Sequence, residues 1–404
     1  RVVLESDSLA MGVDVAVWYP AGVAAERSGL AGASHLVERL MFRGSAAVPD
    51  GEHRRRLLAE GGAVNTQMSP DYACYWQTVP GEALALALRL EAARMAGLAH
   101  TPEAFEAERR AARADVRALA ERPVVTRALG RLRARLFEGQ AYGRALPGSD
   151  ADLARLTPAQ VEAWRRGAYA PGSAVITIVG RFDREATLDA VRRLFEGLPR
   201  GAAAAPPVWK APAPGERRGW GREDTPAHLL LAGWRAPGAA DPDAPAMELL
   251  AQVLGSGENS RLQRSLVQEW RAAALTQAGF VPHRDASMFW AMAAIGAGAD
   301  SSNAERTLLD QVQRLAREPV TVEELERVRG PLLTRELSLL QTARARASAL
   351  GEAVCFTGDP SAAGRRLEAL ARLTPADLQR AAQRVLTEES RAIVWLAPRE
   401  EGVR

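Results

Sequence analysis

The sequence predicts an α+β protein made of two similar domains, in each of which helices pack on a mostly antiparallel sheet. Three observations lead to this fold class. Similar segments recur at a nearly constant offset, a proline-rich stretch separates the two copies, and strand and helix patterns occur without strict alternation. The length of 404 residues also suits two domains of ordinary size.

The two halves of the chain share short segments in the same order. An alternating strand pattern ends in WYPAG at residues 18–22, and a similar pattern ends in WRAPG at residues 234–238. LTPAQVEAW begins at Leu156 and LTPADLQRA begins at Leu373, and each leads through a helical pattern into a strand. Two matches at offsets of 216 and 217 residues indicate a duplicated domain.

The LTP segments also mark where two helices begin. Thr157 and Thr374 are expected N-caps, because a threonine side chain accepts a hydrogen bond from the first turn of a helix. Pro158 and Pro375 suit the first helical position, where no amide donor is needed.

The stretch GAAAAPPVWKAPAPG at residues 201–215 cannot continue a helix or a central strand, because its four prolines lack the amide donor. We interpret it as a linker. The expected division is an N-terminal domain at 1–200, a linker at 201–216 and a C-terminal domain at 217–404.

Composition excludes several classes of protein. The formal net charge is only +3, and basic residues stand beside acidic ones, so we expect no nucleic-acid partner. No run of 18 apolar residues occurs, so we expect no membrane span. The expected location is the cytoplasm, or the periplasm if a leader has been removed. Cys74 and Cys355 lie far apart in sequence, which argues against a disulfide framework or a cysteine zinc site.

The segment ASHLVERLMFRGS at residues 33–45 carries the main chemical signal. It holds His35 and Glu38 at the spacing H-x-x-E and has Arg39 where the inverted zinc motif H-x-x-E-H needs its second histidine. No two of the five histidines are three to five residues apart, so the chain has no local two-histidine metal motif.

Helical spacing puts these polar residues on one face and an apolar stripe on another. The stripe is Leu36, Val37, Leu40 and Met41. The segment at 105–123 predicts a second helix, one face of which carries Glu108, Ala111, Ala112 and Asp115. The two alanines leave room for another helix to approach between the carboxylates.

From residue 21 to residue 45, AGVAAERSGLAGASHLVERLMFRGS resembles the zinc-motif region of the inverzincin peptidases, the family of pitrilysin, insulin-degrading enzyme and the mitochondrial processing peptidase. The similarity continues through AEGGAVNTQMSPDYACYW and AYGRALPGSDADLARLTPAQV into LGSGENSRLQRSLVQEWRAAAL of the second half. The resemblance implies two similar α+β domains, and it implies that such a pair associates with another pair into a closed chamber.

The resemblance also implies a role for each motif position. His35 matches the first zinc ligand, Glu38 the general base, and Arg39 the second ligand position. Asp115 falls at the third ligand position. Glu108 matches an acidic residue that supports the zinc ligands in the family. Asn65, in GGAVN, matches a residue that contacts the substrate backbone.

Two of the three ligand positions have therefore changed. Arginine stays protonated and has no lone pair to give to a cation. Aspartate in place of glutamate draws the carboxylate back by one methylene, roughly 1.5 Å, against zinc–oxygen distances of about 2.0 to 2.2 Å. We therefore expect no zinc in this chain and zinc in a partner subunit.

A second feature implied by the resemblance is an arginine and tyrosine pair that binds the substrate carbonyl. The arginine position reads Val267, and the tyrosine position reads Ala274 or, with a shift of one residue, Leu275. All five tyrosines lie before the linker, so no alignment supplies the tyrosine.

Two residues keep alternative interpretations. Arg39 is either a built-in cation that neutralises Glu38, Asp115 and Glu108, or a side chain that points to solvent. Asn65 is either a substrate contact or a residue of a turn or strand end.

These observations favour a non-catalytic subunit of a heterodimeric zinc metalloendopeptidase. Its partner is expected to be a homologous chain with an intact H-x-x-E-H, and the substrate a peptide or unfolded polypeptide. One alternative is an active zinc peptidase with an aberrant site built on His35, Glu38 and Asp115. The other is a structural or assembly subunit without proteolysis, like the family's core proteins in respiratory complexes.

Overall fold

The computed structural model describes residues 1–144, 147–201, 209–210, 212–296 and 298–399. The chain divides into two compact units. Unit 1 consists of Arg1–Ala120, Ala145–Val208 and Leu337–Ala363, and unit 2 consists of Glu121–Arg144, Trp209–Glu336 and Gly364–Arg404. Each unit therefore includes one segment from the opposite half of the sequence.

Two helices account for this exchange. α5 (Val124–Leu136) comes from the first half of the chain and belongs to unit 2, and α12 (Ala343–Thr357) comes from the second half and belongs to unit 1. A linear division at 201–216 therefore describes the two sequence repeats and not the two compact units. Half of that predicted linker, residues 202–208 and 211, lies outside the described residues.

Each unit contains one five-stranded sheet, and the two sheets have equivalent strand orders, β1-β5-β2-β4-β3 and β6-β10-β7-β9-β8. The outermost pairs β1·β5 and β6·β10 are parallel, and the remaining pairs are antiparallel. The predicted duplication into two mostly antiparallel α+β domains is thus confirmed. The strands are β1 (Val2–Ser6), β2 (Val13–Tyr19), β3 (Ala63–Met68), β4 (Ala73–Val79), β5 (Val175–Gly180), β6 (Arg217–Glu223), β7 (His228–Pro237), β8 (Ala273–Val281), β9 (Ala286–Ile295) and β10 (Arg391–Pro398).

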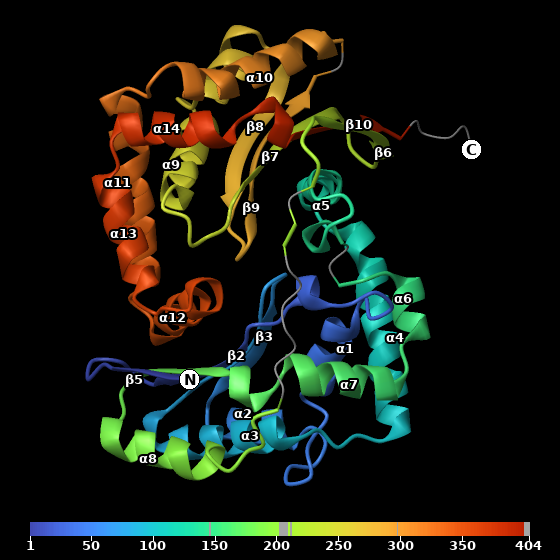
Figure 1. Ribbon diagram of the computed structural model, residues 1–404, viewed down its shortest axis with the longest axis vertical. Helices are drawn as coiled ribbons and strands as arrows, with labels where there is room; N and C mark the ends of the chain where they lie inside the picture. Colours follow the sequence, from blue (N-terminus) through green and yellow to red (C-terminus); the bar gives the residue numbers. More distant parts are fainter. Residues whose placement is uncertain (145–146, 202–208, 211, 297, 400–404) are drawn as a thin grey trace. The chain divides into compact units, whose positions relative to one another are not determined.

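Helices accompany both sheets (Figure 1). Besides α12, those of unit 1 are α1 (Ala33–Leu40), α2 (Glu52–Ala59), α3 (Leu84–Ala96), α4 (Pro102–Ala118), α6 (Asp150–Arg155), α7 (Pro158–Ala168) and α8 (Arg184–Phe195). Besides α5, those that lie wholly or mostly in unit 2 are α9 (Ala244–Gly255), the π-helix η6 (Gln263–Glu269), α10 (Ser301–Arg317), α11 (Val322–Leu339), α13 (Ala362–Arg372) and α14 (Pro375–Val385). Short 3-10 turns are η1 (Val23–Ala25), η2 (Gly81–Ala83), η3 (Leu119–Glu121), η4 (Ala141–Gly143), η5 (Pro171–Ser173) and η7 (Glu388–Ser390).

The predicted N-caps are present at both LTP segments. The Thr157 side chain accepts a hydrogen bond from the amide of Gln160, and the Thr374 side chain accepts one from Asp377. In each case the third helical residue bonds back to the threonine amide, so that both ends form a capping box.

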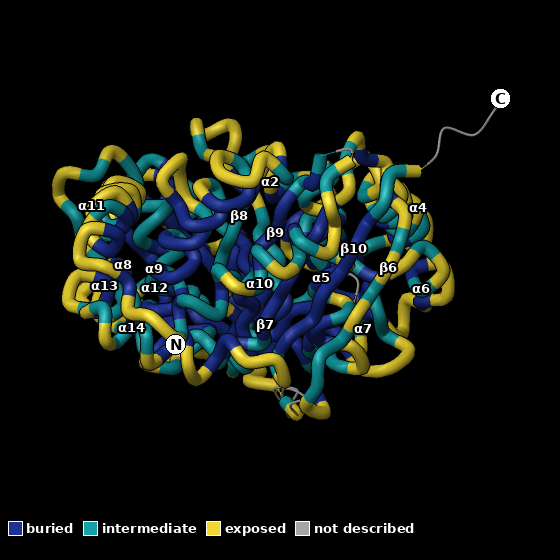
Figure 2. Tube along the Cα trace, turned by 90° about the horizontal axis from the view of Figure 1, so that it is seen from above, coloured by how far each residue is buried: buried dark blue, intermediate teal, exposed yellow. Residues whose placement is uncertain are grey.

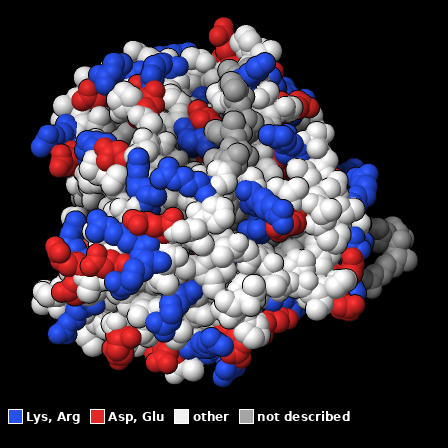
Figure 3. Space-filling view, turned by 60° about the horizontal axis from the view of Figure 1, so that its bottom comes forward, with Lys and Arg blue, Asp and Glu red and all other residues white. Residues whose placement is uncertain are grey.

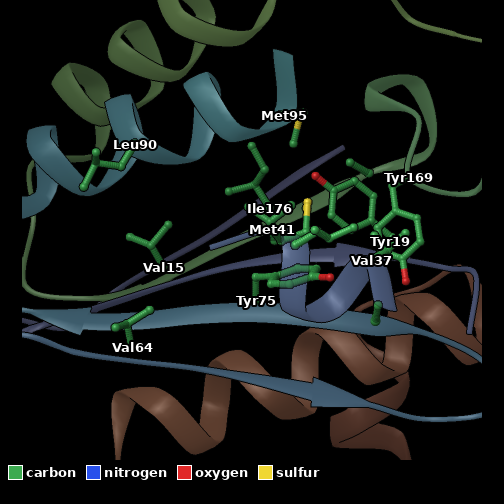
Figure 4. Packing of buried hydrophobic residues seen from close by; sticks show 14 of the residues in the cluster. Val15, Tyr19, Val37, Met41, Val64, Tyr75, Leu90, Met95, Tyr169 and Ile176 are labelled. Atoms are coloured by element: carbon green, nitrogen blue, oxygen red, sulfur yellow. The ribbon is translucent and has the colours of Figure 1, made fainter. Parts of the chain in front are cut away.

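The central strand β2 is buried along its whole length, because both faces of the first sheet are covered. One face carries Val13, Val15, Val17 and Tyr19, which join the main core with α1 and α3. Figure 4 shows Val15 and Tyr19 in this core, with Val37 of α1, the helix that carries the H-x-x-E motif, and Met41, which directly follows that helix. The opposite face carries Ala16 and Trp18, which pack against α12.

The exchanged helix α12 lies directly on Trp18. A Cβ atom added at Gly351 would be 2.0 Å from Cε2 of the Trp18 indole, so only a glycine permits this approach. The indole Nε1 donates to Thr177 Oγ1 at 3.0 Å, and Tyr72 donates its hydroxyl hydrogen to Glu352 Oε1 at 2.6 Å. The second sheet has an equivalent contact, where Gly233 of β7 faces Leu132 of α5.

The surface agrees with the predicted mixture of charges. Figure 2 shows β10 of the second sheet as mostly buried tube, whereas the edge strand β6 beside it is partly exposed. Figure 3 shows basic and acidic side chains next to one another on one face rather than in separate fields. Over the part of the chain that the structure describes, no helix combines the length and apolarity needed to cross a membrane.

We expect Gly351→Ala to destabilise unit 1 by about 1 to 3 kcal/mol, because the new methyl group overlaps the Trp18 indole. The matched control is Gly130→Ala in α5, where an added Cβ meets no atom within 4 Å and alanine favours the helix. Denaturant unfolding of both variants gives the comparison. Equal midpoints for Gly351→Ala and the wild type would show that the contact does not constrain α12.

Candidate functional site

The helix that carries the motif begins at a tight turn. Gly32 precedes α1 with φ of +86°, a conformation that glycine adopts without strain. The Glu26 carboxylate then accepts hydrogen bonds from the backbone amides of Gly32 at 2.9 Å and Ser34 at 2.7 Å. A carboxylate at this position satisfies free amides of the first turn and interacts favourably with the helix dipole.

The predicted apolar stripe of α1 is buried, with exposed fractions of 2% or less for Leu36, Val37, Leu40 and Met41. The helix packs against α4, on which Ala112 is fully buried. This close approach puts Glu108 and Asp115 of α4 beside the polar side chains of α1, as the spacing predicts.

Arg39 lies between those two carboxylates. Its Nε is 2.5 Å from Glu108 Oε2, and its Nη1 is 2.8 Å from Asp115 Oδ2. Glu108 is nine-tenths buried, and its other oxygen accepts a hydrogen bond from Arg43 Nε at 2.6 Å. The guanidinium therefore sits inside an ion-pair network, and the interpretation that Arg39 points to solvent does not describe it.

His35 is 8% exposed, and its Nε2 is 3.3 Å from the same Asp115 oxygen that Arg39 contacts. Burial lowers the pKa of His35 below its usual value, and the nearby Glu38 and Asp115 charges oppose that shift only in part. If the imidazole of His35 is neutral, it can donate a hydrogen bond to Asp115 only when its single ring proton is on Nε2, the nitrogen that faces this carboxylate. Within the described residues, Nδ1 is buried and has no hydrogen-bond partner.

Glu38 is engaged by a different residue than we predicted. Its Oε1 accepts a hydrogen bond from the Thr66 hydroxyl of β3, and the ion pairs of Arg39 are with Glu108 and Asp115. The expected neutralisation of Glu38 by a direct contact with Arg39 is therefore not seen. The reason is geometric, because the guanidinium reaches across to α4 while the adjacent Glu38 faces the sheet.

Asn65 is exposed on β3, which forms an edge of the first sheet. Its Oδ1 accepts a hydrogen bond from the backbone amide of Thr66 at 2.8 Å. An edge strand has unpaired backbone groups on its outer side. The role of Asn65 in substrate binding stays a prediction.

Two participants were missed from the sequence. Arg43 follows Arg39 by four residues, so helical spacing could have indicated it as a second cation for Glu108. Thr66 carried no comparable signal, because its contact with Glu38 depends on how β3 lies against α1.

The donor set does not fit zinc. The nitrogen of His35 that faces the site is directed at Asp115, and the second ligand position holds a guanidinium without a lone pair. No group of three or more His, Cys, Asp or Glu side chains in the described ranges is arranged to hold a metal ion.

The second feature implied by the resemblance also lacks functional groups. Val267 lies in η6 and packs partly against the core of unit 2. The register of β8 shifts between Ala273 and Leu275, which leaves Ala274 in a β-bulge. Leu275 is 41% exposed. None of these side chains can donate a hydrogen bond to a carbonyl.

Comparison with known proteins identifies relatives along nearly the whole chain. Residues 1–150 match the family model described as Insulinase (Peptidase family M16), and residues 155–332 match the model described as Peptidase M16 inactive domain. An uncharacterized zinc protease of Streptomyces coelicolor is 26% identical over 399 residues, which cover 96% of this chain and 85% of that protein.

Solved structures show the same fold. A protease from Helicobacter pylori superposes with a TM-score of 0.89 at 21% identity and covers 98% of this chain and 97% of that one. A structure described as a peptidase M16 inactive domain from Pseudomonas fluorescens has a TM-score of 0.87 at 19% identity, with 99% and 96% covered. The matched models, the relatives and the duplicated fold together establish that this chain belongs to the M16 peptidase family.

Proposed function

We propose that this chain is a non-catalytic member of the M16 peptidases that acts as one subunit of a heterodimeric metalloendopeptidase. The observation that carries the proposal is the position of Arg39, whose guanidinium is paired with Glu108 and Asp115 where the family motif has a zinc ligand. A fixed positive charge balances these carboxylates but cannot polarise a carbonyl as a Lewis acid or lower the pKa of a bound water.

Hydrolysis would also need a free general base. Glu38 accepts a hydrogen bond from the Thr66 hydroxyl. The side chains around Glu38 do not form a metal site, so they would not hold a metal-bound water for this carboxylate to activate. The Val267 and Ala274 positions add no group for stabilising a tetrahedral intermediate. Because these catalytic groups are missing, we infer that the chain assists proteolysis as a subunit and does not catalyse it.

In the proposed heterodimer, the partner is a homologous chain with an intact H-x-x-E-H that holds zinc. This chain contributes part of the wall of the substrate chamber and contacts an extended peptide along the exposed edge of β3, where Asn65 lies. Main-chain hydrogen bonds to an edge strand bind peptides of many sequences, which suits a peptidase of unfolded polypeptides.

We expect the purified chain to bind no zinc at the His35 site and to cleave no unfolded peptide, because positions 39 and 115 no longer supply two ligands. Elemental analysis of protein prepared without chelator and a fluorogenic peptide assay measure both properties. Near-stoichiometric zinc that disappears in His35→Ala would establish the alternative, an active peptidase with an aberrant site.

We expect Arg39→Ala to lower stability by about 1 to 3 kcal/mol, because it leaves the largely buried Glu108 with one of its two cations and Asp115 without its closest one. Arg55→Ala is the control, since that side chain is 69% exposed in its pair with Glu52 and should change stability by less than about 0.5 kcal/mol. Denaturant midpoints compare the two variants. A midpoint for Arg39→Ala equal to that of Arg55→Ala would mean that the network adds no stability.

The subunit role predicts activity in a mixture. A homologous chain with H-x-x-E-H should form a complex with this chain that survives gel filtration, which requires roughly 1,000 Å² or more of buried surface. Peptidase activity should appear mainly in the mixture and vanish when the motif glutamate of the homologous chain is changed to glutamine. Glu38→Gln in this chain should change the rate little.

Two results would count against this role. If Glu38→Gln abolishes the activity of the mixture, the chemistry resides in this chain. If no homologous chain co-purifies from the native source, the protein acts without a catalytic partner, as a structural or assembly subunit does.

A further inference from the structure

The helix α2 is attached to the rest of unit 1 by very few side chains. It has eight residues, of which only His53 and Leu57 are buried. A glycine, Gly51, stands at its N-cap position, so no side chain caps the first turn. A short and mostly polar helix has little stability of its own, and α2 therefore depends on its two buried side chains.

These two side chains lie on one face of α2 but have different surroundings. Leu57 is fully buried in the main apolar core of unit 1. His53 is 3% exposed and enters a group of buried polar side chains. Its Nε2 is 3.4 Å from Gln77 Oε1 of β4, and its ring stands nearly perpendicular to that of Phe42, with the centroids 5.8 Å apart.

The group around His53 already contains a matched pair of charges. Glu91 and Arg94 of α3 are both buried, and Arg94 Nη2 donates to Glu91 Oε1. The same oxygen accepts a hydrogen bond from Gln77 Nε2 at 2.8 Å. Because an ionised carboxylate only accepts, Gln77 turns its amide nitrogen to Glu91 and its oxygen to His53. A neutral His53 with its proton on Nε2 suits this arrangement and adds no charge to it.

A protonated His53 would not suit the same group. Arg94 already supplies its positive charge, and the guanidinium lies 4.6 Å from the ring centroid of Tyr75 and 5.1 Å from that of Phe42. Glu91 Oε1 is 3.8 Å from His53 Nε2 and already binds Arg94. An imidazolium would thus be a second buried cation beside a single carboxylate.

Burial is the main reason why His53 resists protonation, and the Arg94 charge adds to it. Together they lower the pKa of His53 to about 3, although the hydrogen bond with Gln77 acts in the opposite direction. The edge strand β3 also packs on α2 and has no ionisable residue, and the charged side chains of α2 itself are not buried. In an opened α2, His53 would regain its ordinary pKa of about 6.5. The docked helix is therefore fully stable above about pH 6.5 and loses stability as the pH falls below that value.

We propose that His53 is an acid-sensitive switch, whose protonation releases α2 from the first sheet. Only residues 60–62 separate α2 from β3, so release of the helix would loosen the beginning of the edge strand that carries Asn65 and Thr66. The inference does not rest on the proposed function, because it concerns unit 1 of the chain without partner or peptide.

Hydrogen exchange of the full chain, read by mass spectrometry of peptides that cover residues 52–59, measures the opening of α2. Between pH 7.5 and 5.5 we expect the protection of its amides, corrected for the intrinsic exchange rate at each pH, to fall about tenfold. The factor follows because the docked His53, with its pKa of about 3, stays neutral over this range. Peptides from the central strands β2 and β5 should keep their protection.

Two variants test whether His53 is the group that binds the proton. His53→Gln and His53→Phe remove the ionisable ring, one with a polar and one with an apolar side chain. Either variant should abolish the pH dependence of α2 protection, whatever its protection at pH 7.5, because the dependence requires a titrating group. His228→Gln is the matched control, since His228 is exposed on β7 of unit 2, and it should keep the tenfold fall. His35 is present in all of these proteins, so its titration does not distinguish them.

The proposal is wrong if α2 of the wild type keeps its protection down to pH 5.5. It is equally wrong if both His53 variants show the full tenfold fall, which would assign the effect to another group. A fall of the same size in β2 and β5 as in α2 would mean that acid unfolds unit 1 as a whole and that no local switch exists.

Discussion

The pairing of one guanidinium with two carboxylates on a neighbouring helix determines the character of the candidate site. Arg39 brings its charge to Glu108 and Asp115, and Arg43 supplies a second charge to Glu108. Without a cation, two adjacent carboxylates, one of them nine-tenths buried, would repel each other. The arginine therefore links α1 to α4, and it does so from the position at which the H-x-x-E-H motif has its second histidine.

The exchange of α5 and α12 between the two units is the second constraint. In unit 1, α12 covers the face of the first sheet opposite to the one on which α1 packs. β2 can be apolar on both sides because α12 covers the face that α1 and α3 leave open. Gly351 lets that helix touch Trp18, and Gly233 permits the corresponding contact of α5 in unit 2. Each sheet thus depends on a helix that is remote in sequence, which makes the two halves of the chain unable to complete their cores separately.

The candidate site could be predicted in part. The spacing of His35, Glu38 and Arg39 on one helix and of Glu108 and Asp115 on another follows from a period of 3.6 residues, and the small residues between the carboxylates indicated a close helix contact. The engagement of Glu38 by Thr66 was not predictable, because it depends on the position of a strand 28 residues later. The buried group around His53 was also absent from the prediction, since its members come from α2, β4 and α3, which only the fold brings together.

The sequence by itself determined the duplicated α+β fold, the capping of the two LTP helices and the loss of ligand chemistry at position 39. These properties depend on local periodicity, on side-chain hydrogen bonds within one turn and on the chemical nature of a guanidinium, none of which needs a tertiary contact. The tertiary structure alone decided which sheet each of α5 and α12 would cover, and which carboxylates Arg39 would pair with. An apolar stripe shows that a helix is buried but not against which surface, and a long charged side chain can reach several partners until packing fixes one.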